Sequence, residues 1–211
     1  MLITSVEEIK RYRVDHEVFI QIQKEGVVQT KYGEYSVLVF VDEVDQKQHL
    51  ALVKGDLSSR KNPIVRIHSE CLTGDILSSL RCDCGDQLDL SLSRISEEGV
   101  GVLLYLRQEG RGIGLSNKLK AYSLQDLGHD TVQANVELGF KADSRSFAAA
   151  AKMLEYLNVK SVRLLTNNPR KLDTLKRLGL LSVEREALLI PPNPFSEAYL
   201  DAKREKLGHL F

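Results

Sequence analysis

The sequence predicts an α/β protein: a three-layer α/β/α domain with a mixed, largely parallel sheet and an antiparallel β unit near the N-terminus. Two patterns indicate this fold. From residue 64 to 190, short apolar runs rich in β-branched residues alternate with amphipathic helical stretches, as in βαβ units. Before residue 64, three apolar segments follow one another with only turns between them. We expect residues 1–16 to form a helix or linker and residues 17–211 to form the main domain.

Composition excludes several classes of protein. Lys plus Arg and Asp plus Glu both number 29, so the net charge is zero, whereas a nucleic-acid surface needs a basic excess. No run approaches the ~20 apolar residues that span a bilayer. The three cysteines and the lack of an apolar N-terminal run argue against secretion. We therefore expect a cytoplasmic protein that binds neither nucleic acid nor membrane.

The N-terminal part should contain one helix and three strands. In residues 1–16, Ser5 and Glu8 have the spacing of a capping box, and Val6 and Ile9 are apolar at helical spacing. This segment fits a surface helix. The strands are expected at 17–23, 35–42 and 49–54, with turns at 31–33 and 42–48.

After residue 64 we expect alternating strands and helices. The expected strands are 64–69, 100–106, 161–165 and short strands within 182–190. The expected helices are 74–80, 86–98 ending at Gly99, 113–127, one that runs to Leu157, 170–178 and 197–208. Caps are expected from Thr73, from Asp143 or Ser144, and from Ser196.

All three cysteines lie within residues 66–85, RIHSECLTGDILSSLRCDCG. Thiolates suit zinc, and Cys82 and Cys84 flank a single residue, with Gly85 giving the backbone room to turn. Three thiolates leave one tetrahedral position for water, as in a catalytic site. From spacing alone, His68 could instead be the fourth ligand of a closed structural site, or the cysteines could be three unrelated buried thiols.

A glycine-rich loop follows the apolar run of residues 100–106 and reads RQEGRGIG. A strand, such a loop and a helix together expose backbone N–H groups that suit an anion. Arg111 adds a guanidinium that can hold phosphate through two hydrogen bonds. The loop is not a Walker motif and lacks the full dinucleotide fingerprint, so by itself it indicates phosphate binding only weakly.

These segments together resemble the GTP cyclohydrolase II family. The words RIHSECLTGD, RCDCG, LRQEGRGIGL, KADSRSF and RLLTNNPRK agree with it in order, from about Val27 to the C-terminus. The resemblance implies zinc-dependent opening of the imidazole ring of GTP, with loss of formate and pyrophosphate, as the first step of riboflavin biosynthesis. It further implies Mg²⁺ with the triphosphate, a homodimer, and residues 17–211 as the catalytic domain. Cys71, Cys82 and Cys84 would hold the zinc with water as fourth ligand, so His68 would not be a ligand.

The resemblance also assigns the other site residues. Asp143 would accept a proton, Arg145 would attack the α-phosphorus, and Tyr122 would lie near the purine. The expected GTP contacts are Arg66, Ile67, His68, Ser69, Glu70, Gln87, Glu109, Gly110, Arg111, Thr131, Thr166 and Lys171. Glu109 is the natural acceptor for the donors of guanine. Taken alone, Tyr122 would be a core residue, and Arg66 and Lys171 would be solvated charges.

Two other functions stay open at this stage. A zinc-stabilised nucleotide sensor without turnover would have a closed metal site that includes His68. A related cyclohydrolase that stops early would release the formylated intermediate. Residues 1–16 also resemble the junction of bifunctional proteins in which a dihydroxybutanone phosphate synthase precedes the cyclohydrolase half; no such activity is assigned here.

Overall fold

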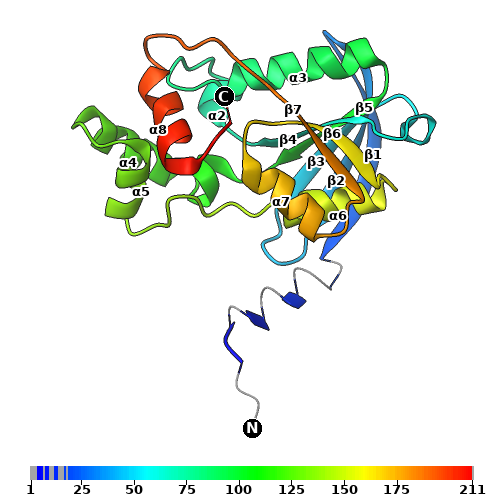
Figure 1. Ribbon diagram of the computed structural model, residues 1–211, viewed down its shortest axis with the longest axis horizontal. Helices are drawn as coiled ribbons and strands as arrows, with labels where there is room; N and C mark the ends of the chain where they lie inside the picture. The colour runs from blue at the N-terminus through cyan, green and yellow to red at the C-terminus, as the bar shows by residue number, and fades with distance from the viewer. Residues whose placement is uncertain (1–3, 7, 10–11, 14–16, 18, 211) are drawn as a thin grey trace.

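The computed structural model describes residues 4–6, 8–9, 12–13, 17 and 19–210. They form one mixed seven-stranded sheet in the order β1-β2-β3-β5-β4-β6-β7 (Figure 1). The strands are β1 Ile20–Thr30, β2 Gly33–Asp42, β3 Gln48–Lys54, β4 Ile64–Ser69, β5 Gly101–Leu106, β6 Ser161–Leu165 and β7 Ser182–Glu186. This confirms the predicted α/β class.

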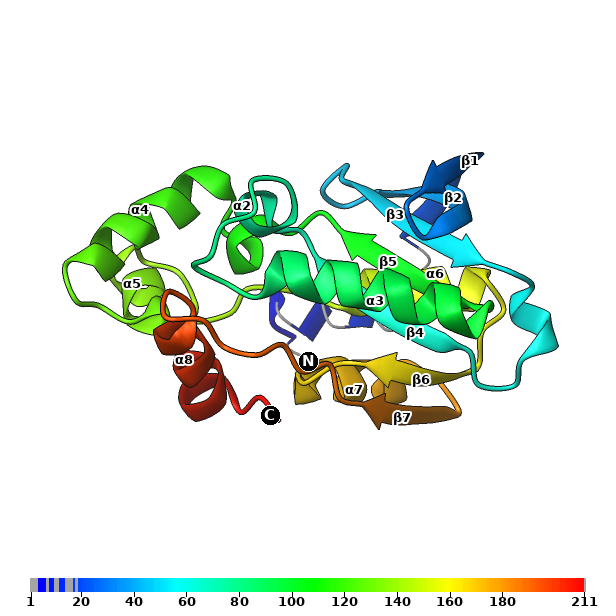
Figure 2. The same ribbon diagram turned by 90° about the horizontal axis from the view of Figure 1, so that it is seen from above.

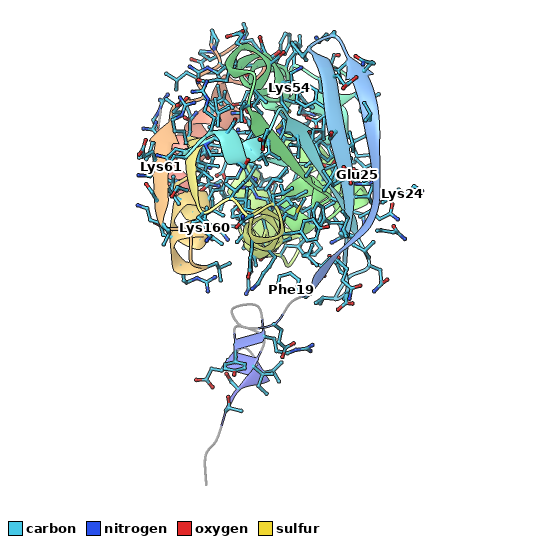
Figure 3. The ribbon with its side chains drawn as sticks, turned by 90° about the vertical axis from the view of Figure 1, so that its right-hand side faces the viewer. Phe19, Lys24, Glu25, Lys54, Lys61 and Lys160 are labelled. Carbon is cyan, nitrogen blue, oxygen red and sulfur yellow. The ribbon has the colours of Figure 1, made fainter. Side chains whose placement is uncertain are left out.

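The antiparallel unit is continuous with the rest of the sheet. Strands β1, β2, β3 and β5 pair antiparallel, and β5, β4, β6 and β7 pair parallel. Each kind therefore accounts for half of the strand pairings. The first strand lies further along the chain than the expected 17–23 and runs to Thr30. It is an edge strand, and its Lys24 and Glu25 side chains project from that edge (Figure 3), which discourages pairing with another chain.

Seven α-helices are found in the described part of the chain. They are α2 Leu72–Asp75, α3 Cys84–Glu98, α4 Leu115–Asp126, α5 Thr131–Glu137, α6 Ala148–Tyr156, α7 Pro169–Arg177 and α8 Glu197–Leu207. The described residues also form two short 3₁₀ helices, η1 Leu57–Ser59 and η2 Glu109–Gly112. No helix among the described residues is long and apolar enough to cross a bilayer.

The helices cover both faces of the sheet, so the domain has three layers (Figures 1 and 2). On one face, Ile95 of α3 packs with Ile64 and Leu103 of the sheet. On the other face, α6 and α7 pack against a larger cluster that includes Met153 and Leu175. Helices α4, α5 and α8 lie together at one end. That end adjoins the carboxyl ends of the parallel strands.

Chain order explains why a crevice opens at that end. After β4 the chain crosses over α3 to β5 on one side, and it later returns to β6 on the other side of β4. In doubly wound sheets, ligands bind outside the strand ends at such a reversal. Here β4 and β6 pair only through Ile64–Arg163 and Val65–Leu164. They separate beyond these pairs, which opens the crevice.

Several predicted caps are wrong. Helix α6 begins only at Ala148, its N-cap is Phe147, and no side chain caps it. Thr73 lies inside α2, whose N-cap is Cys71. Ser196 does precede α8, but its hydroxyl makes no capping bond; it bonds to Asn193 instead. In each case a tertiary partner or a local turn takes the oxygen that a cap would use.

Other local predictions hold. Helix α3 ends at Gly99 in the left-handed conformation. Ser5 and Glu8 exchange both hydrogen bonds of the capping box, and the described Val6, Glu8 and Ile9 are helical; the rest of the 1–16 prediction falls partly on residues outside the described part. Helix α5, which begins at Thr131 with a capping box from Asp130, was not predicted.

Candidate active site

Two adjoining cavities lie at the carboxyl ends of the parallel strands. The cysteine cavity, of about 640 Å³, is lined by Ser69, Glu70, Cys71, Arg81, Cys82, Cys84, Glu109, Gly110, Arg111, Ile113, Lys118, Ala121, Tyr122, Gln125, Thr131, Arg145 and Tyr199. The basic cavity, of about 460 Å³, is lined by Arg66, His68, Ser69, Cys84, Gln87, Arg145, Thr166, Asn167, Asn168, Lys171, Tyr199, Lys203 and His209. Four lining residues are common to both, so the cavities form one elongated site.

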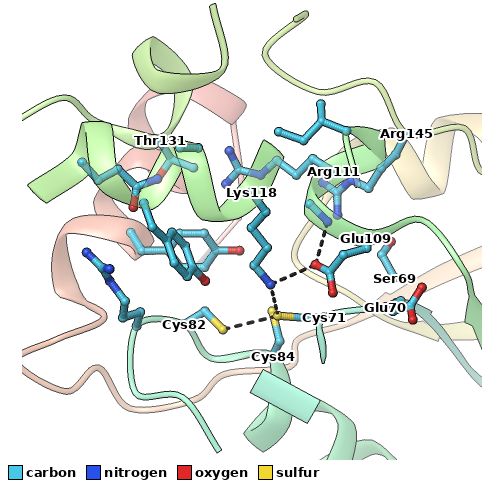
Figure 4. Close-up of a pocket in the computed structure, with 17 residues that line it drawn as sticks. Ser69, Glu70, Cys71, Cys82, Cys84, Glu109, Arg111, Lys118, Thr131 and Arg145 are labelled. Atoms are coloured by element: carbon cyan, nitrogen blue, oxygen red, sulfur yellow. Dashed lines mark hydrogen bonds and ion pairs between the residues drawn. The ribbon is translucent and has the colours of Figure 1, made fainter. Parts of the chain in front are cut away.

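The three cysteines converge on one point of the cysteine cavity (Figure 4). Their sulfurs all lie within 4.8 Å of one another, and Cys71 Sγ is 3.7 Å from Cys82 Sγ. Zinc–sulfur bonds of about 2.3 Å in a tetrahedron put two sulfurs about 3.8 Å apart. The Cys71–Cys82 distance therefore matches zinc coordination, and the third sulfur lies close enough to join it. Among the described residues it is the one group of His, Cys, Asp or Glu side chains close enough to hold a metal.

Two glycines allow the chain to close around this point. A Cβ on Gly85 would lie 2.4 Å from the carbonyl oxygen of Gly74, and a Cβ on Gly74 would lie 3.0 Å from Cys82 Sγ. Helix α2 and the start of α3 thus touch through bare backbone. The sequence analysis assigned Gly85 to a turn, but its φ is not positive. Close approach, not turning, is what requires glycine here.

The cluster holds one thiolate when no metal is bound. Hydrogen bonds from Cys82 and Cys84 lower the pKa of the Cys71 thiol far below its usual range. The same pairing with Cys71 raises the pKa of Cys82 to about 11 and raises the pKa of Cys84 well above its usual value. Metal binding deprotonates all three thiols. A bound cation would therefore offset negative charge on the three sulfurs.

His68 is turned away from the sulfurs. Its Nε2 lies 3.0 Å and 3.1 Å from the two oxygens of Asp75, and its ring stacks on Tyr105. Burial lowers the pKa of His68 against the opposing effect of Asp75. Asp75 also accepts hydrogen bonds from the Cys71 backbone N–H and the Tyr105 hydroxyl. His68 thus steadies the carboxylate that fixes Cys71, and this arrangement disfavours a closed site with four protein ligands.

Lys118 is a functional residue that the sequence analysis missed. Its Nζ lies 3.1 Å from Cys71 Sγ, 2.8 Å from Thr73 Oγ1 and 2.9 Å from Glu109 Oε1 (Figure 4). Burial alone would lower the pKa of Lys118, but the charge of Cys71 and the hydrogen bond to Glu109 raise it overall. The ammonium therefore stays charged beside the metal ligands. One feature of the sequence could have indicated Lys118: it lies four residues before Tyr122, which puts both side chains on the same helix face.

Glu109 is held by the protein itself. Its Oε2 accepts from Leu72 N at 2.6 Å, and its Oε1 accepts from Gly110 N at 2.7 Å as well as from Lys118. A carboxylate offers about four lone-pair positions. These three donors therefore leave room for about one donor from a ligand.

Tyr122 faces the cysteine cavity from α4. Its hydroxyl lies 3.3 Å from Thr73 Oγ1, and the Arg81 guanidinium lies 4.6 Å from its ring centroid. Burial raises the pKa of Tyr122, so the phenol is protonated at neutral pH. It can donate a hydrogen bond or stack on a base. Thr131 lines the same cavity from the first turn of α5.

The glycine-rich loop presents Arg111 to the cavity in a strained conformation. Gly110, Arg111 and Gly112 all have positive φ, which is rare for arginine. The two terminal nitrogens of Arg111 are buried without a protein partner, and the guanidinium lies 5.4 Å from the Tyr199 ring centroid. A strained, buried and unsatisfied cation points to an anionic ligand.

Asp143 and Arg145 form a paired unit. Arg145 Nε and NH2 donate to the two Asp143 oxygens at 2.9 Å and 2.8 Å, and Arg170 adds a contact of 2.7 Å. Burial alone would raise the pKa of Asp143, but Arg145 lowers it overall. Burial likewise opposes the charge of Arg145, yet Asp143 raises its pKa. Both groups are therefore ionised at neutral pH.

The basic cavity gathers residues from β4, α3, α7 and α8 and from loops outside them. Arg66 of β4 donates to Leu165 O and to Gln87 Oε1, while its Nε is buried without a partner. Burial lowers the pKa of Arg66 to about 10. Lys171 of α7 donates to Ile67 O at 2.7 Å, and burial together with Arg66 lowers its pKa well below the usual value. These cations are held close together with few counter-charges.

The expected site residues are brought together with two qualifications. Ile67 is fully buried in the core, and only its carbonyl reaches the site, through Lys171. Asp143 lines neither cavity and is linked to them only through its contact with Arg145. The remaining expected residues line one cavity or both. Besides Lys118, Asp75 and Asp83 were not predicted as site residues. Asp75 bonds to His68 and to the Cys71 backbone nearby in the chain and to Tyr105, 30 positions away, and Asp83 bonds to Lys203, 120 positions away.

Comparison with known proteins identifies the family. The family model described as GTP cyclohydrolase II matches residues 21–187. The GTP cyclohydrolase-2 of Haemophilus influenzae is 53% identical over 191 residues, which cover 90% of this chain and 88% of that protein. The riboflavin biosynthesis protein RibBA of Synechocystis is 52% identical over 207 residues, 97% of this chain. The chain spans 37% of that protein's length, and 50% of the RibBA of Chlorobium phaeovibrioides.

A solved structure shares the fold. RibBX of A. baumannii, a two-domain 3,4-dihydroxy-2-butanone 4-phosphate synthase, superposes with a TM-score of 0.53 at 21% identity. The match covers 87% of this chain and 44% of that one. At this identity the likeness concerns the fold alone.

Proposed function

Because this chain belongs to the GTP cyclohydrolase II family of riboflavin biosynthesis, we propose that it opens the imidazole ring of GTP by zinc-dependent hydrolysis. The products are formate, pyrophosphate and 2,5-diamino-6-(5-phospho-D-ribosylamino)pyrimidin-4(3H)-one. One observation carries the proposal: a cavity with three converging thiol sulfurs adjoins a cavity rich in buried cations. These suit the two ends of a nucleoside triphosphate.

Cys71, Cys82 and Cys84 are the residues that would hold the zinc. When bound there, zinc supplies a Lewis acid that lowers the pKa of water to about 7. Lys118 lies against Cys71 and offsets the excess negative charge of three thiolates. Asp75 fixes the backbone at Cys71. The ligand set therefore comes with charge compensation and orientation already in place.

At the guanine end, Glu109 and Tyr122 are the residues suited to the base. Glu109 has capacity for about one more donor, such as a guanine N–H. The protonated Tyr122 can donate to the base or stack on it. A site that accepts a hydrogen bond from guanine should reject ATP strongly, often by ~10⁴-fold.

At the phosphate end, the chain supplies fixed positive charge. Arg145 and Arg111 are cations that can stabilise charge developing at the α-phosphorus during loss of pyrophosphate. Lys171, whose pKa is lowered well below its usual value, can donate a hydrogen bond there. Because Asp143 keeps Arg145 protonated, electrostatic stabilisation fits this residue better than nucleophilic attack. Mg²⁺ carried by the triphosphate would add to this charge.

Independent assay of formate and pyrophosphate release from GTP tests the proposal. Cys84→Ser removes a metal ligand and should abolish formate release far more than pyrophosphate release. Arg145→Ala should show the reverse bias, or lose both steps if phosphate attack must come first. Arg60→Ala, an exposed arginine away from both cavities, is the control.

Two results would refute this division of labour: formate release at the wild-type rate by a folded, zinc-free Cys84→Ser protein, or normal pyrophosphate release by Arg145→Ala. A chain that releases the formylated intermediate instead of formate would be the early-stopping relative. The homodimer and the cytoplasmic location expected from the sequence stay predictions.

A further inference from the structure

The C-terminal segment forms one wall of the basic cavity. Tyr199 and Lys203 of α8, and His209 just beyond it, line this cavity together with residues of β4, α3 and the loop after β6. The chain end runs back from α8 toward the body of the domain (Figures 1 and 2). None of these three residues entered the sequence analysis as a site residue.

Specific hydrogen bonds hold this segment in place. Gly208 ends α8 in the left-handed conformation, and the His209 N–H donates to the Lys203 carbonyl at 3.1 Å. The Leu210 N–H then donates to the Asn167 carbonyl at 2.8 Å, and Arg185 donates to the Leu210 carbonyl at 2.9 Å. The His209 backbone is thus fixed beside the loop that carries Thr166.

The basic cavity has the charge of a polyanion site. Four cations line it (Arg66, Arg145, Lys171 and Lys203), and no carboxylate is among its described lining residues. Arg66, Lys171 and Lys203 are buried, and the Arg145 side chain is 13% exposed. Asp143 pairs with Arg145 and Asp83 with Lys203, whereas Arg66 and Lys171 have only neutral hydrogen-bond partners among the described residues. Burying such groups without a counter-charge is unfavourable. The Arg66 Nε–H is buried without a hydrogen-bond partner, which again indicates that an acceptor is lacking in this cavity.

Lys203 has donors left for a ligand. Its ammonium donates to Asp83 Oδ1 at 2.6 Å and lies 4.3 Å from the Tyr199 ring centroid. Asp83 also accepts from Gln87, so this carboxylate is shared. An ammonium has three donors. Asp83 therefore positions Lys203 at the cavity wall without using its full capacity.

We propose that Lys203 and His209 are additional contacts for the polyphosphate, so that the C-terminal segment completes the phosphate half of the site. This inference rests on the proposed function, because it takes the ligand to be the triphosphate of that reaction. The recognising chemistry is two cationic or hydrogen-bonding groups placed opposite Arg145 and Lys171. Free pyrophosphate, a product of the same reaction, presents the same groups and serves as the probe.

The protonation of His209 gives the proposal a second measurable consequence. Burial, then the charges of Lys203, Arg145, Lys171 and Arg111, lower its pKa to about 3. His209 is therefore neutral at pH 7 in the free protein. A phosphate anion entering among these cations would raise the pKa of His209, so binding should take up protons and should strengthen as the pH falls.

Calorimetric titration with inorganic pyrophosphate tests the proposal without turnover. Lys203→Met should weaken binding by about tenfold or more, the effect of one charge-assisted contact. Lys206→Met is the matched control, since Lys206 lies on the same helix but pairs with Asp130, away from the cavity. It should bind like wild type. His209→Gln should weaken binding and abolish proton uptake, measured in two buffers of different ionisation enthalpy.

Different outcomes test the C-terminal phosphate contacts and the proposed function. Equal pyrophosphate affinity in Lys203→Met and Lys206→Met overturns the role of Lys203, as does a wild type that binds no pyrophosphate. If Lys203→Met fails to fold because Asp83 is left unpaired, His209→Gln decides, and unchanged affinity and proton uptake overturn the inference. A wild type that binds pyrophosphate with these variant effects but releases no formate from GTP refutes the proposed function and leaves the C-terminal contacts standing.

Discussion

At the residue scale, the site depends on charges that are buried beside partners of opposite sign. Lys118 lies between Cys71 and Glu109, and Asp143 lies between Arg145 and Arg170. Buried charges are tolerated when they are paired and become strongly unfavourable when one partner is removed. Single substitutions at these positions should therefore have large and specific effects.

Lys118→Met should lower zinc affinity by about 10–100-fold, the usual effect of losing a group that supports metal ligands. The physical reason is that three thiolates around one zinc carry excess negative charge, which the ammonium offsets. Chelator competition measures this directly. Lys120→Met, an exposed lysine on the same helix, is the control, and wild-type zinc affinity in Lys118→Met would show that the ammonium does not support the metal.

Asp143→Asn should lower the free energy of unfolding at pH 7 by about 3 kcal/mol, because two arginines lose a buried counter-charge. The pKa of Asp143 is lowered from 3.8 in the folded protein. Its stabilising effect is therefore complete above about pH 4 and is lost as the pH falls through the folded value. Urea unfolding of wild type and variant at several pH values should show the gap narrowing in acid.

The exposed Asp173→Asn on α7 is the control for that series. A gap between wild type and Asp143→Asn that stays constant as the pH falls well below 3.8 would mean that the pair with Arg145 does not account for the stabilisation.

At the element scale, short pieces of secondary structure position the ligands. One turn of helix, α2, follows Cys71, and α3 begins at Cys84. The two elements touch through Gly74 and Gly85. This backbone contact lets the three sulfurs converge on one point.

Gly85→Ala should reduce both stability and zinc content. Its Cβ would meet the Gly74 carbonyl at 2.4 Å, so α2 would have to move, and overpacking of this kind costs about 1–3 kcal/mol. Gly26→Ala, where a Cβ meets nothing within 4 Å, is the control. Urea midpoints and metal analysis of both variants test this, and a fully zinc-loaded Gly85→Ala of normal stability would contradict it.

At the scale of the whole molecule, the core and the metal site are separate. The two large hydrophobic clusters lie on the two faces of the sheet and contain no cysteine. Zinc should therefore serve chemistry and local order, unlike the metal of a zinc finger, without which the domain does not fold.

Chelation should leave the sheet intact. The far-ultraviolet circular dichroism of the metal-free protein should match that of the zinc form, while formate release from GTP is lost and returns on adding zinc. Thermal unfolding should remain cooperative with a lower midpoint. Loss of the folded spectrum on chelation would instead assign the metal a structural role.

Local sequence patterns determined much of this protein. Alternation of apolar runs with amphipathic helices gave the α/β class and most element boundaries, since periodicity reflects which side faces the core. The three clustered cysteines indicated a metal site, and their sulfurs do converge on one point. The match of several motifs in order supplied the expected nucleotide contacts, which stay predictions.

Only the tertiary structure decided how these parts meet. Lys118 reaches Cys71 across 47 positions of sequence, and Lys203 reaches Asp83 across 120; no local period encodes such distances. Asp143 was expected to cap a helix, but the guanidinium groups of Arg145 and Arg170 take its oxygens and α6 starts later. His68 was a possible ligand until its ring proved to face Asp75. Propensity fixes local elements, whereas burial and pairing of charge depend on which elements the fold brings together.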